Sequence, residues 1–270
     1  LKKVTLADTI TEIAAGAFYY CIALEEVNLP DSVTDIGIYA FANCYALREL
    51  KLPPHIKSIP DYAFYYNIGL EEVIIPDEVT SIGTQSFVYC YSLRKLHIPA
   101  SVTDIADMAI VSCMGLETFD LDSGNWTYKV NEDGVLLSAD GTRLIAYPVG
   151  VEKESYTVPD GVKSIAPYAF SGALRLKQIT LPDSVKEIGD GTFSDCQALE
   201  TVTVPQQITA IPVCLFAGCV SLQSFTIPQG VTSIAESAFY GCEKLTEMVI
   251  PDSVTEIRAW AFYGCTGLPG

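Results

Sequence analysis

The residues of this chain that could support catalysis are nine cysteines, two histidines and 33 Asp and Glu residues. Hydrolysis by a nucleophile needs a Ser or Cys beside a base. The two histidines, His55 and His97, fall in different units of the repeat described below, and no strained nucleophile turn accompanies them. Carboxylate pairs such as Glu71 and Glu72 fall at outward positions, where nothing buries them. We therefore expect no enzyme active site.

Metal-binding patterns are also absent from the sequence. The chain has no Cys-x-x-Cys pair, so no zinc site is expected. Asp120, Asp122, Asn131, Glu132 and Asp133 are residue types that bind calcium, but they lack the order D-x-D-x-D-G-x₅-E of a calcium loop. We expect neither a metal nor another cofactor.

Tyrosine is the remaining residue type with a suggestive distribution. Nine of the 15 tyrosines lie between Tyr19 and Tyr91. A tyrosine side chain offers a large contact area, little entropy loss and a polar tip, which is why recognition surfaces favour it. We predict that the following seven form a binding patch: Tyr19, Tyr20, Tyr45, Tyr65, Tyr66, Tyr89 and Tyr91. Packing between adjacent repeats is the alternative explanation.

A 23-residue repeat must position these side chains. Prolines recur at this step in two groups, Pro30, Pro53, Pro76 and Pro99, then Pro159, Pro182, Pro205, Pro228 and Pro251. Counted from the proline, with Ala7 in its place in the first unit, the sixth residue is Ile in all ten units. The eleventh is Phe in nine of ten, with Ile110 as the exception, and the seventeenth is always Leu. A strict period of this length indicates stacked units.

Each unit should contribute one short strand. Residues 47–52 alternate apolar and polar side chains, which is typical of a half-buried strand. The following proline ends the strand. Val33, Ile36, Ala40 and Phe41 have spacings of three and four residues, which favour helical or 3₁₀ turns. Stacked units would pair eleven strands in parallel over about 50 Å, at roughly 4.8 Å a step.

The two proline groups are separated by extra residues. Turn signals at residues 131–134 and 139–141 flank Val135-Leu136-Leu137, and an apolar run follows at 144–147. We predict one continuous domain, with repeats at 1–122 and 159–270 and a β-hairpin insert at 123–158. The insert is interpreted as a structural spacer, and a ligand-contacting protrusion is the alternative.

Cysteine also follows the repeat. Eight of the nine cysteines occupy the fourteenth position after the proline, where Asn67 and Ala173 stand in the other two units. Such a column predicts a small buried residue whose thiol or amide bonds a loop carbonyl. It does not reveal the redox compartment.

The charge balance restricts the partners. Acidic residues outnumber basic ones by 33 to 16, so the net charge of -17 disfavours nucleic acid. No apolar run approaches the roughly 20 residues that span a bilayer. Outward strand residues alternate in sign along Lys2, Glu25, Arg48 and Glu71, which predicts exposed cross-strand ion pairs.

The pattern A-F-x-x-C-x-x-L-x-x-V-x-L-P, nearly complete at residues 40–53 and 238–251, resembles the BspA-like subclass of leucine-rich repeats. The resemblance implies an α/β solenoid, a right-handed superhelix with a parallel sheet on one face. It also implies a bacterial or protozoal protein that is secreted or displayed at the cell surface. Some members are adhesins, so the expected partner is a protein or a host extracellular-matrix ligand, with a glycan as the alternative. A structural spacer or stalk that presents another domain is the alternative function.

The ends of the chain fall inside the repeat. Leu1 occupies the seventeenth position of a preceding unit, and a new strand should begin after Leu268. Solenoids need polar caps over their end cores. We expect either further repeats or caps outside this sequence, or ends that pair with neighbouring molecules.

Overall fold

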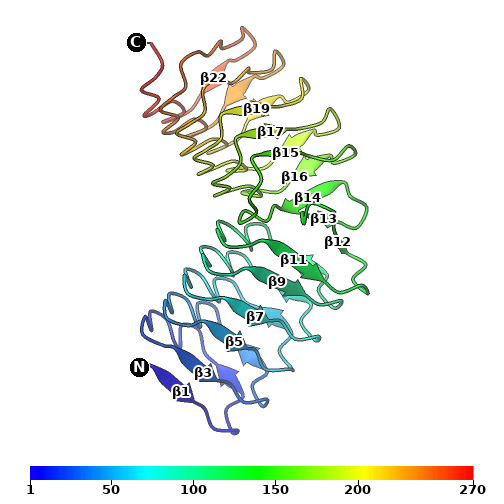
Figure 1. Ribbon diagram of the computed structural model, residues 1–270, viewed down its shortest axis with the longest axis vertical. Helices are drawn as coiled ribbons and strands as arrows, with labels where there is room; N and C mark the ends of the chain where they lie inside the picture. The colour runs from blue at the N-terminus through cyan, green and yellow to red at the C-terminus, as the bar shows by residue number, and fades with distance from the viewer. Residues whose placement is uncertain (270) are drawn as a thin grey trace. The chain divides into compact units, whose positions relative to one another are not determined.

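The structure is a computed structural model that describes residues 1–269. Contacts divide the chain into two compact units, which are described separately. Unit 1 is Leu1–Ala139 and unit 2 is Asp140–Gly270, in which residue 270 lies outside the described part. Each unit is a β-solenoid whose successive coils are one repeat long (Figure 1).

Parallel strands form the main face of unit 1 (Figure 1). They are β1 (Lys3–Thr5), β3 (Glu26–Asn28), β5 (Glu49–Lys51), β7 (Glu72–Ile74), β9 (Lys95–Ile98) and β11 (Thr118–Leu121). Equivalent residues pair directly, for instance Val4 with Val27 and Leu50 with Val73. In β5 the central Leu50 is buried between exposed neighbours, which confirms the predicted alternation.

A second row of two-residue strands runs along another side of each coil. In unit 1 it comprises β2 (Glu12–Ile13), β4 (Asp35–Ile36), β6 (Ser58–Ile59), β8 (Ser81–Ile82) and β10 (Asp104–Ile105). These strands hold the isoleucine column, and Ile59 pairs in parallel with Ile82. The repeat spacing does not predict this row, because two residues are too short for an alternating pattern.

The helical and 3₁₀ turns expected between strands are not found in residues 1–269. Alternate amides have different partners there. The amide of Phe18 donates to the Ala40 carbonyl of the next coil at 2.8 Å, whereas that of Cys21 donates to the Phe18 carbonyl within its own coil at 3.1 Å. A helix uses every amide within its own segment. Here half of the amides donate to carbonyls of the next coil instead, so the segment forms single turns and no helix.

The phenylalanine column forms the core of each unit. In unit 1 the ring centroids of Phe18 and Phe41 lie 5.2 Å apart, and those of Phe64 and Phe87 lie 5.3 Å apart. Phe41, Phe64 and Phe87 are fully buried. Each ring packs on the ring of the next coil, so the core is continuous only while coils remain stacked.

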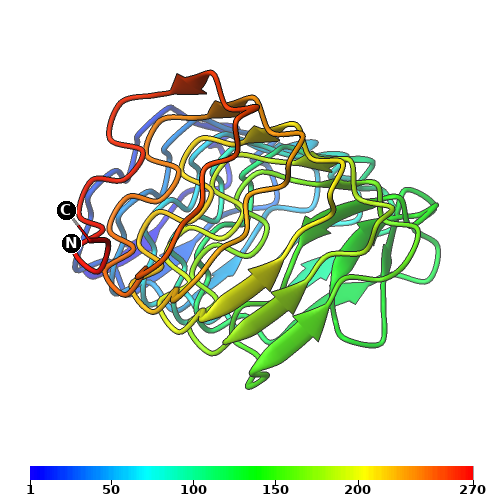
Figure 2. The same cartoon turned by 90° about the horizontal axis from the view of Figure 1, so that it is seen from above.

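Unit 2 repeats both rows (Figures 1 and 2). Its main row is β15 (Ser155–Thr157), β17 (Gln178–Thr180) and β19 (Thr201–Thr203), and its second row is β16 (Ser164–Ile165), β18 (Glu187–Ile188), β20 (Ala210–Ile211), β21 (Ser233–Ile234) and β22 (Glu256–Ile257). The main row continues as a single bridge between Ser224 and Glu247. Seen from above, the yellow-green and orange strands of this unit lie on different sides of its coils (Figure 2).

The segment between the proline groups contains three strands, divided between the two units. In unit 1, β12 (Tyr128–Val130) pairs antiparallel with β13 (Leu136–Ser138). Tyr128 stands in the isoleucine column, and its hydroxyl accepts the Ile105 amide at 2.8 Å. In unit 2, β14 (Arg143–Ala146) pairs in parallel with β16, and Tyr147 stacks on Phe170 at 5.0 Å. The apolar run at 144–147 therefore builds a coil of unit 2.

The buried cysteines donate hydrogen bonds to the backbone. The Sγ atoms of Cys44 and Cys196 lie 3.2 Å and 3.1 Å from the carbonyl oxygens of Phe18 and Phe170, one coil earlier. Cys90, Cys113, Cys219, Cys242 and Cys265 make the same bond to the corresponding Phe. This confirms the role predicted for the column, since the thiols satisfy turn carbonyls inside the core.

Candidate functional site

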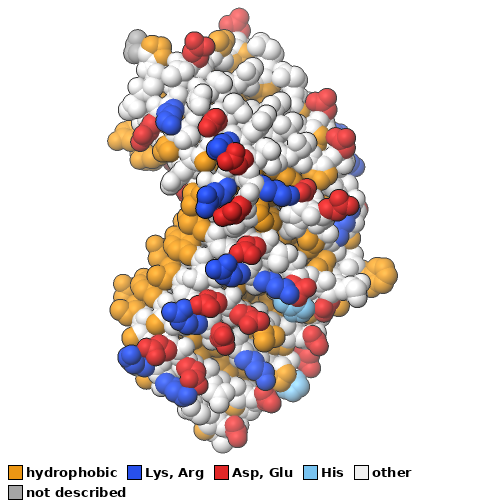
Figure 3. All heavy atoms as spheres, viewed as in Figure 1, with side chains coloured by type: hydrophobic (Ala, Val, Ile, Leu, Met, Phe, Trp, Pro, Cys, Tyr) orange, Lys and Arg blue, Asp and Glu red, His pale blue; other side chains and the backbone are white. Residues whose placement is uncertain are grey.

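The tyrosines of unit 1 lie in the turns that precede its main strands, between the phenylalanine and leucine columns. Four such turns, residues 14–24, 37–47, 60–70 and 83–93, hold all nine of them. The Phe side chain of each turn points into the core. Tyr19 and Tyr65, which follow it, are exposed and half-buried, whereas Ala42 and Val88 at the same position are buried. Figure 3 shows hydrophobic side chains, tyrosine included, gathered along the left edge of the lower part of the view.

All seven predicted tyrosines belong to one connected set of ring contacts. Neighbouring ring centroids in this set are 4.5 to 6.2 Å apart. Two further members, Tyr39 and Tyr62, were not among the predicted residues; they stack on each other at 4.5 Å and link Tyr19 to Tyr65. Their common position, nine residues after the proline or its equivalent, is the sequence signal that could have identified them. We call these nine residues the tyrosine band.

The band combines packing with exposure. Tyr19 and Tyr20 are 54% and 59% exposed, and the other seven are half-buried. Most contacts are edge-to-face or tilted, as between Tyr66 and Tyr89 at 68° and 5.1 Å. Such pairs stabilise by about 0.5–1.5 kcal/mol beyond the area they bury. Packing between repeats, the alternative explanation, therefore accounts for part of each ring and leaves an outer surface.

Five tyrosines of the band have a left-handed backbone, at two positions of the repeat where the other coils also have positive φ. Tyr20, Tyr66 and Tyr89 have φ of 62°, 61° and 61°, and Tyr39 and Tyr62 have φ of 57° and 58°. This left-handed region costs a residue with a Cβ roughly 1–2 kcal/mol, and bulky residues are rare in it. Strained residues of this kind concentrate at functional sites.

Unit 2 uses the same backbone positions differently. At the thirteenth residue after the proline, the column of Tyr20, Tyr66 and Tyr89, unit 2 has Gly172, Asp195, Gly218, Gly241 and Gly264, all with positive φ. Glycine takes this conformation without strain. The repeat itself therefore does not require tyrosine there, and unit 1 has it against the local backbone preference.

The four tyrosine-bearing turns are almost uncharged. They contain one ionisable carboxylate, Asp61, whose Oδ1 accepts the Thr84 amide at 2.7 Å, and no Lys or Arg. Burial raises the pKa of the Tyr45 phenol, and the nearby Tyr20 raises it further. Burial and the neighbouring Tyr62 raise the pKa of Tyr39 in the same way. The surface is therefore neutral and apolar, with phenol hydroxyls as its polar groups.

The main strands of unit 1 present a charged face beside the band (Figure 3). The predicted cross-strand pairs are present: Lys2 with Glu25 at 2.8 Å, Arg48 with Glu71, and Arg94 with Glu117 at 2.8 Å. Their side chains are about half to three-quarters exposed, so solvent screens each pair and it contributes little to stability. The face is thus a self-paired set of charges.

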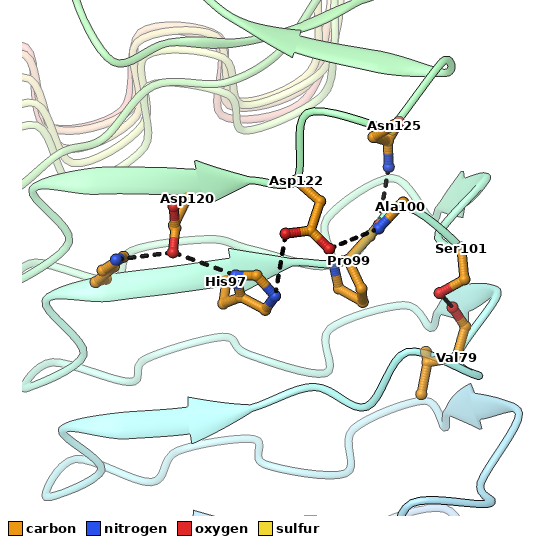
Figure 4. A network of polar contacts seen from close by, with 9 residues as sticks. Val79, His97, Pro99, Ala100, Ser101, Asp120, Asp122 and Asn125 are labelled. Atoms are coloured by element: carbon orange, nitrogen blue, oxygen red, sulfur yellow. Dashed lines mark hydrogen bonds and ion pairs between the residues drawn. The ribbon is translucent and has the colours of Figure 1, made fainter.

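One cluster on this face brings a histidine beside carboxylates (Figure 4). His97 Nδ1 lies 3.2 Å from Asp120 Oδ2, which also pairs with Lys95 at 2.8 Å, and His97 Nε2 lies 3.9 Å from Asp122. Lys95, and then His97, lower the pKa of Asp120. The hydroxyl of Ser101 donates to the Val79 carbonyl at 2.6 Å, and is engaged there rather than with His97. The cluster therefore pairs adjacent coils and lacks the arrangement of a nucleophile with its base.

Neither a metal site nor a membrane span is found within residues 1–269. No group of three His, Cys, Asp or Glu side chains in that range could hold a metal ion. The side-chain Oδ1 of Asn131, one of the calcium-type residues of the sequence, accepts the amides of Asp133 and Val135 in a turn. No helix in the same range is long and apolar enough to cross a membrane.

Comparisons with known proteins show which family this chain is similar to. The model of the BspA type leucine-rich repeat region matches residues 1–124 and 150–269, in six copies. A leucine-rich cell surface protein of Faecalibacterium prausnitzii is 38% identical, with a TM-score of 0.92 over 100% of this chain and 72% of that one. A leucine-rich repeat protein of Eubacterium ventriosum is 25% identical, with a TM-score of 0.75 over 98% of this chain and 82% of that one.

The pneumococcal vaccine antigen PcpA shares the fold, at 21% identity and a TM-score of 0.75 over 96% of this chain and 75% of that one. A search of the curated proteins found no match.

Proposed function

Because this chain belongs to the family of BspA-type leucine-rich-repeat proteins, we propose that it is a binding module of a bacterial cell-surface protein. Solenoids of this class typically act as non-catalytic scaffolds for protein interactions. In the proposal, the ligand is an extracellular protein and the tyrosine band of unit 1 is the surface that contacts it.

The left-handed tyrosines are the observation that carries this proposal. Five of the nine hold a bulky side chain at positive φ, in columns where glycine also occurs. Stability alone favours glycine at such positions. The strain is explained if the rings serve recognition, since tyrosine is enriched in protein interfaces and contributes strongly to their affinity.

The surface location is supported by the relatives. The Faecalibacterium prausnitzii relative is described as a cell surface protein, and it aligns with the whole of this chain. A spacer that only positions another domain, which is the alternative function, has no use for strained exposed tyrosines. The two functions therefore predict different effects of substitutions in the band: ligand binding should weaken only if the band is a binding surface.

Binding of the purified chain to a panel of extracellular-matrix proteins tests the proposal. We expect saturable binding to at least one of them by surface plasmon resonance. The triple variant Tyr45→Ala, Tyr66→Ala and Tyr91→Ala should weaken it at least about tenfold, because truncating interface tyrosines removes their buried area. The matched control is Tyr240→Ala with Tyr263→Ala, which removes a stacked tyrosine pair of unit 2 with ring centroids 5.1 Å apart. Equal binding by the triple variant and the wild type would refute the band as the site.

Antibodies raised against the chain test its location. They should label intact cells of the source bacterium, and protease treatment of those cells should remove the label. Labelling that appears only after lysis would contradict the surface assignment.

A further inference from the structure

One column of the tyrosine band stops at a glycine. The ninth position after the proline is tyrosine in the second and third coils, as Tyr39 and Tyr62, and glycine in the first coil, as Gly16. The rings of Tyr39 and Tyr62 are stacked, with centroids 4.5 Å apart and 16° between their planes. The Gly16 amide donates to the Ile38 carbonyl at 2.9 Å, so the first and second coils are in contact at this position. The other face of Tyr39 is therefore directed toward Gly16, which has no side chain to cover it.

A hollow lies at this place. Its volume is about 420 Å³, and it is lined by Ala15, Gly16, Tyr19, Ile38 and Tyr39. Small-ligand sites typically enclose roughly 300–1,000 Å³. Tyr19 stands nearly perpendicular to Tyr39, at 78° with centroids 6.0 Å apart, and forms another wall. Tyr19 and Ile38 are 54% and 49% exposed, so the hollow is open to a partner.

Glycine at this position does not always leave a hollow. In unit 2 the same column has Tyr168 in one coil and Gly191 in the next. A Cβ atom placed on Gly191 would overlap the Tyr168 ring, which takes up the space that the glycine leaves. A Cβ atom placed on Gly16 would lie 3.6 Å from the Tyr19 Cβ, and no ring atom of the described residues would lie within 4 Å of it. The space beside Gly16 is therefore not filled by a neighbouring ring.

We propose that this hollow, which we call the Gly16 slot, binds an aromatic side chain of the extracellular protein ligand, stacked on the face of Tyr39 that Gly16 leaves uncovered. This inference rests on the proposed function and names the chemical group that one part of the band binds. The bound ring takes the place that a tyrosine has in the second and third coils, and extends the Tyr39–Tyr62 stack by one ring.

The repeat itself selects an aromatic ring. The ligand ring would lie on Tyr39 as Tyr39 lies on Tyr62, and at that position the structure accepts a ring at a centroid distance of 4.5 Å. Aromatic pairs at such distances attract each other beyond the effect of the area that they bury. A ring in the slot would therefore bind more tightly than an aliphatic side chain of similar size.

The lining of the slot favours a neutral ring. None of its five lining residues is charged. Ile38 contributes an exposed apolar side chain at a position where the next three coils of unit 1 have polar residues, namely Asp61, Thr84 and Asp107. The chain as a whole carries -17, so its field would repel an anionic ring such as a phosphorylated or sulfated tyrosine.

Filling the slot from within the chain tests the inference. Gly16 has φ of 65°, close to the 57° and 58° of Tyr39 and Tyr62, so Gly16→Tyr should fold with its ring in the slot. The matched control is Gly16→Ala, which places a Cβ at the same positive φ but adds no ring. Both variants carry the backbone cost of a Cβ, so a difference between them reports the ring alone. Thermal unfolding checks the fold of each variant.

A small neutral probe identifies the group that binds. The probe is N-acetyl-tyrosinamide, and the matched control is N-acetyl-leucinamide, which has the same backbone and an aliphatic side chain. Each is titrated into the isotope-labelled 270-residue chain up to about 50 mM, because a single side chain binds weakly. We expect saturable shifts of the Gly16 amide resonance with the tyrosine amide, and at least about fivefold weaker binding of the leucine amide. Gly16→Tyr should remove the shifts of neighbouring amides, whereas Gly16→Ala should bind within about twofold of the wild type.

Binding of a matrix protein, measured with the same variants, connects the slot to the proposed function. Gly16→Tyr should weaken binding at least about tenfold, because it displaces a buried aromatic group of the ligand. If Gly16→Tyr binds as the wild type does, while the triple variant Tyr45→Ala, Tyr66→Ala and Tyr91→Ala binds more weakly, the inference is overturned and the proposed function stands. If the tyrosine amide binds but no matrix protein does, the slot takes a free aromatic compound, and both are overturned.

Three further results would overturn the inference alone. The first is the absence of saturable shifts with the tyrosine amide. The second is equal affinity for the leucine amide, which would show that the slot does not select a ring. The third is an equal loss of binding in Gly16→Ala and Gly16→Tyr, because the effect would then come from the backbone and not from the filled space.

Discussion

At the scale of single residues, some positions of the repeat accept many residue types, whereas others require one type. Two columns have left-handed backbone in both units, and their occupants range from Gly16 and Gly218 to Tyr66 and Trp260. Glycine fits these columns without strain, whereas a ring at positive φ opposes the local preference. The backbone therefore does not require tyrosine at these positions, and the proposal of a binding role for the band rests on this freedom.

A buried hydroxyl gives the first prediction. Ser86 is fully buried, and its Oγ has no hydrogen-bond partner among the described residues. Alanine stands at the same position in the adjacent coils, as Ala63 and Ala109. Ser86→Ala should therefore raise the free energy of unfolding by about 1 kcal/mol, because it removes an unpaired polar group from the core. Urea denaturation followed by circular dichroism measures the change.

The control for Ser86 is a hydroxyl in the same column that is satisfied. Thr192 donates to the Gly189 carbonyl at 2.7 Å, so the near-isosteric Thr192→Val should lower the free energy of unfolding by about 1 kcal/mol. A loss of stability in Ser86→Ala would show that the Ser86 hydroxyl has a partner, such as a buried water.

At the scale of elements, the repeat allows the main strands and the core columns to be predicted, but not the rest of each coil. Leu50 and Phe64 follow from apolar periodicity, because their burial is set by local spacing. The isoleucine strands, such as β6, depend on hydrogen bonds to the next coil, which local spacing does not encode. Tyr39 and Tyr62 differ in this respect, because they share one column of the repeat and their contact over 23 positions could have been predicted from it.

The buried cysteines predict how the stability of the fold depends on pH in the alkaline range. Burial raises the pKa of Cys196 from 9.0 to about 12 in the folded chain. Between pH 9 and about 12 the thiol ionises only when the chain unfolds, so stability that is present below pH 9 is lost progressively as pH rises. The slope is about 1.4 kcal/mol per pH unit for each such thiol.

Replacement by alanine tests the role of this thiol. Alanine occupies the column naturally at Ala173, where it is buried, so Cys196→Ala should fold. The free energy of unfolding, measured in urea from pH 8 to 10.5, should fall less steeply with pH than in the wild type, by up to about 1.4 kcal/mol per unit. Ser86→Ala removes no titrating group and should keep the wild-type slope. Identical slopes for Cys196→Ala and the wild type would mean that the folded thiol ionises as readily as the unfolded one.

At the scale of the whole molecule, each unit behaves as a one-dimensional stack. A coil contacts the coils before and after it, so its stability depends on its own turns and on two interfaces. The phenylalanine column shows this arrangement directly. The Phe193 ring packs at a tilt against Phe170 at 5.5 Å and stacks on Phe216 at 5.6 Å, whereas Phe262 stacks on Phe239 at 5.3 Å. Phe193 is fully buried and Phe262 is half-buried.

The stack predicts a position-dependent effect of one substitution. Phe193→Ala in the 270-residue chain should lower the free energy of unfolding by about 3–5 kcal/mol, because it removes a fully buried ring and leaves a cavity between two coils. Phe262→Ala removes a half-buried ring with one stacked neighbour, so it should lower stability by about half as much. Both residues belong to unit 2, and guanidinium denaturation monitored by far-ultraviolet circular dichroism compares them under the same transition. Equal losses would contradict nearest-neighbour stacking and indicate that unit 2 unfolds as one globular core, in which the place of a ring along the stack has no effect.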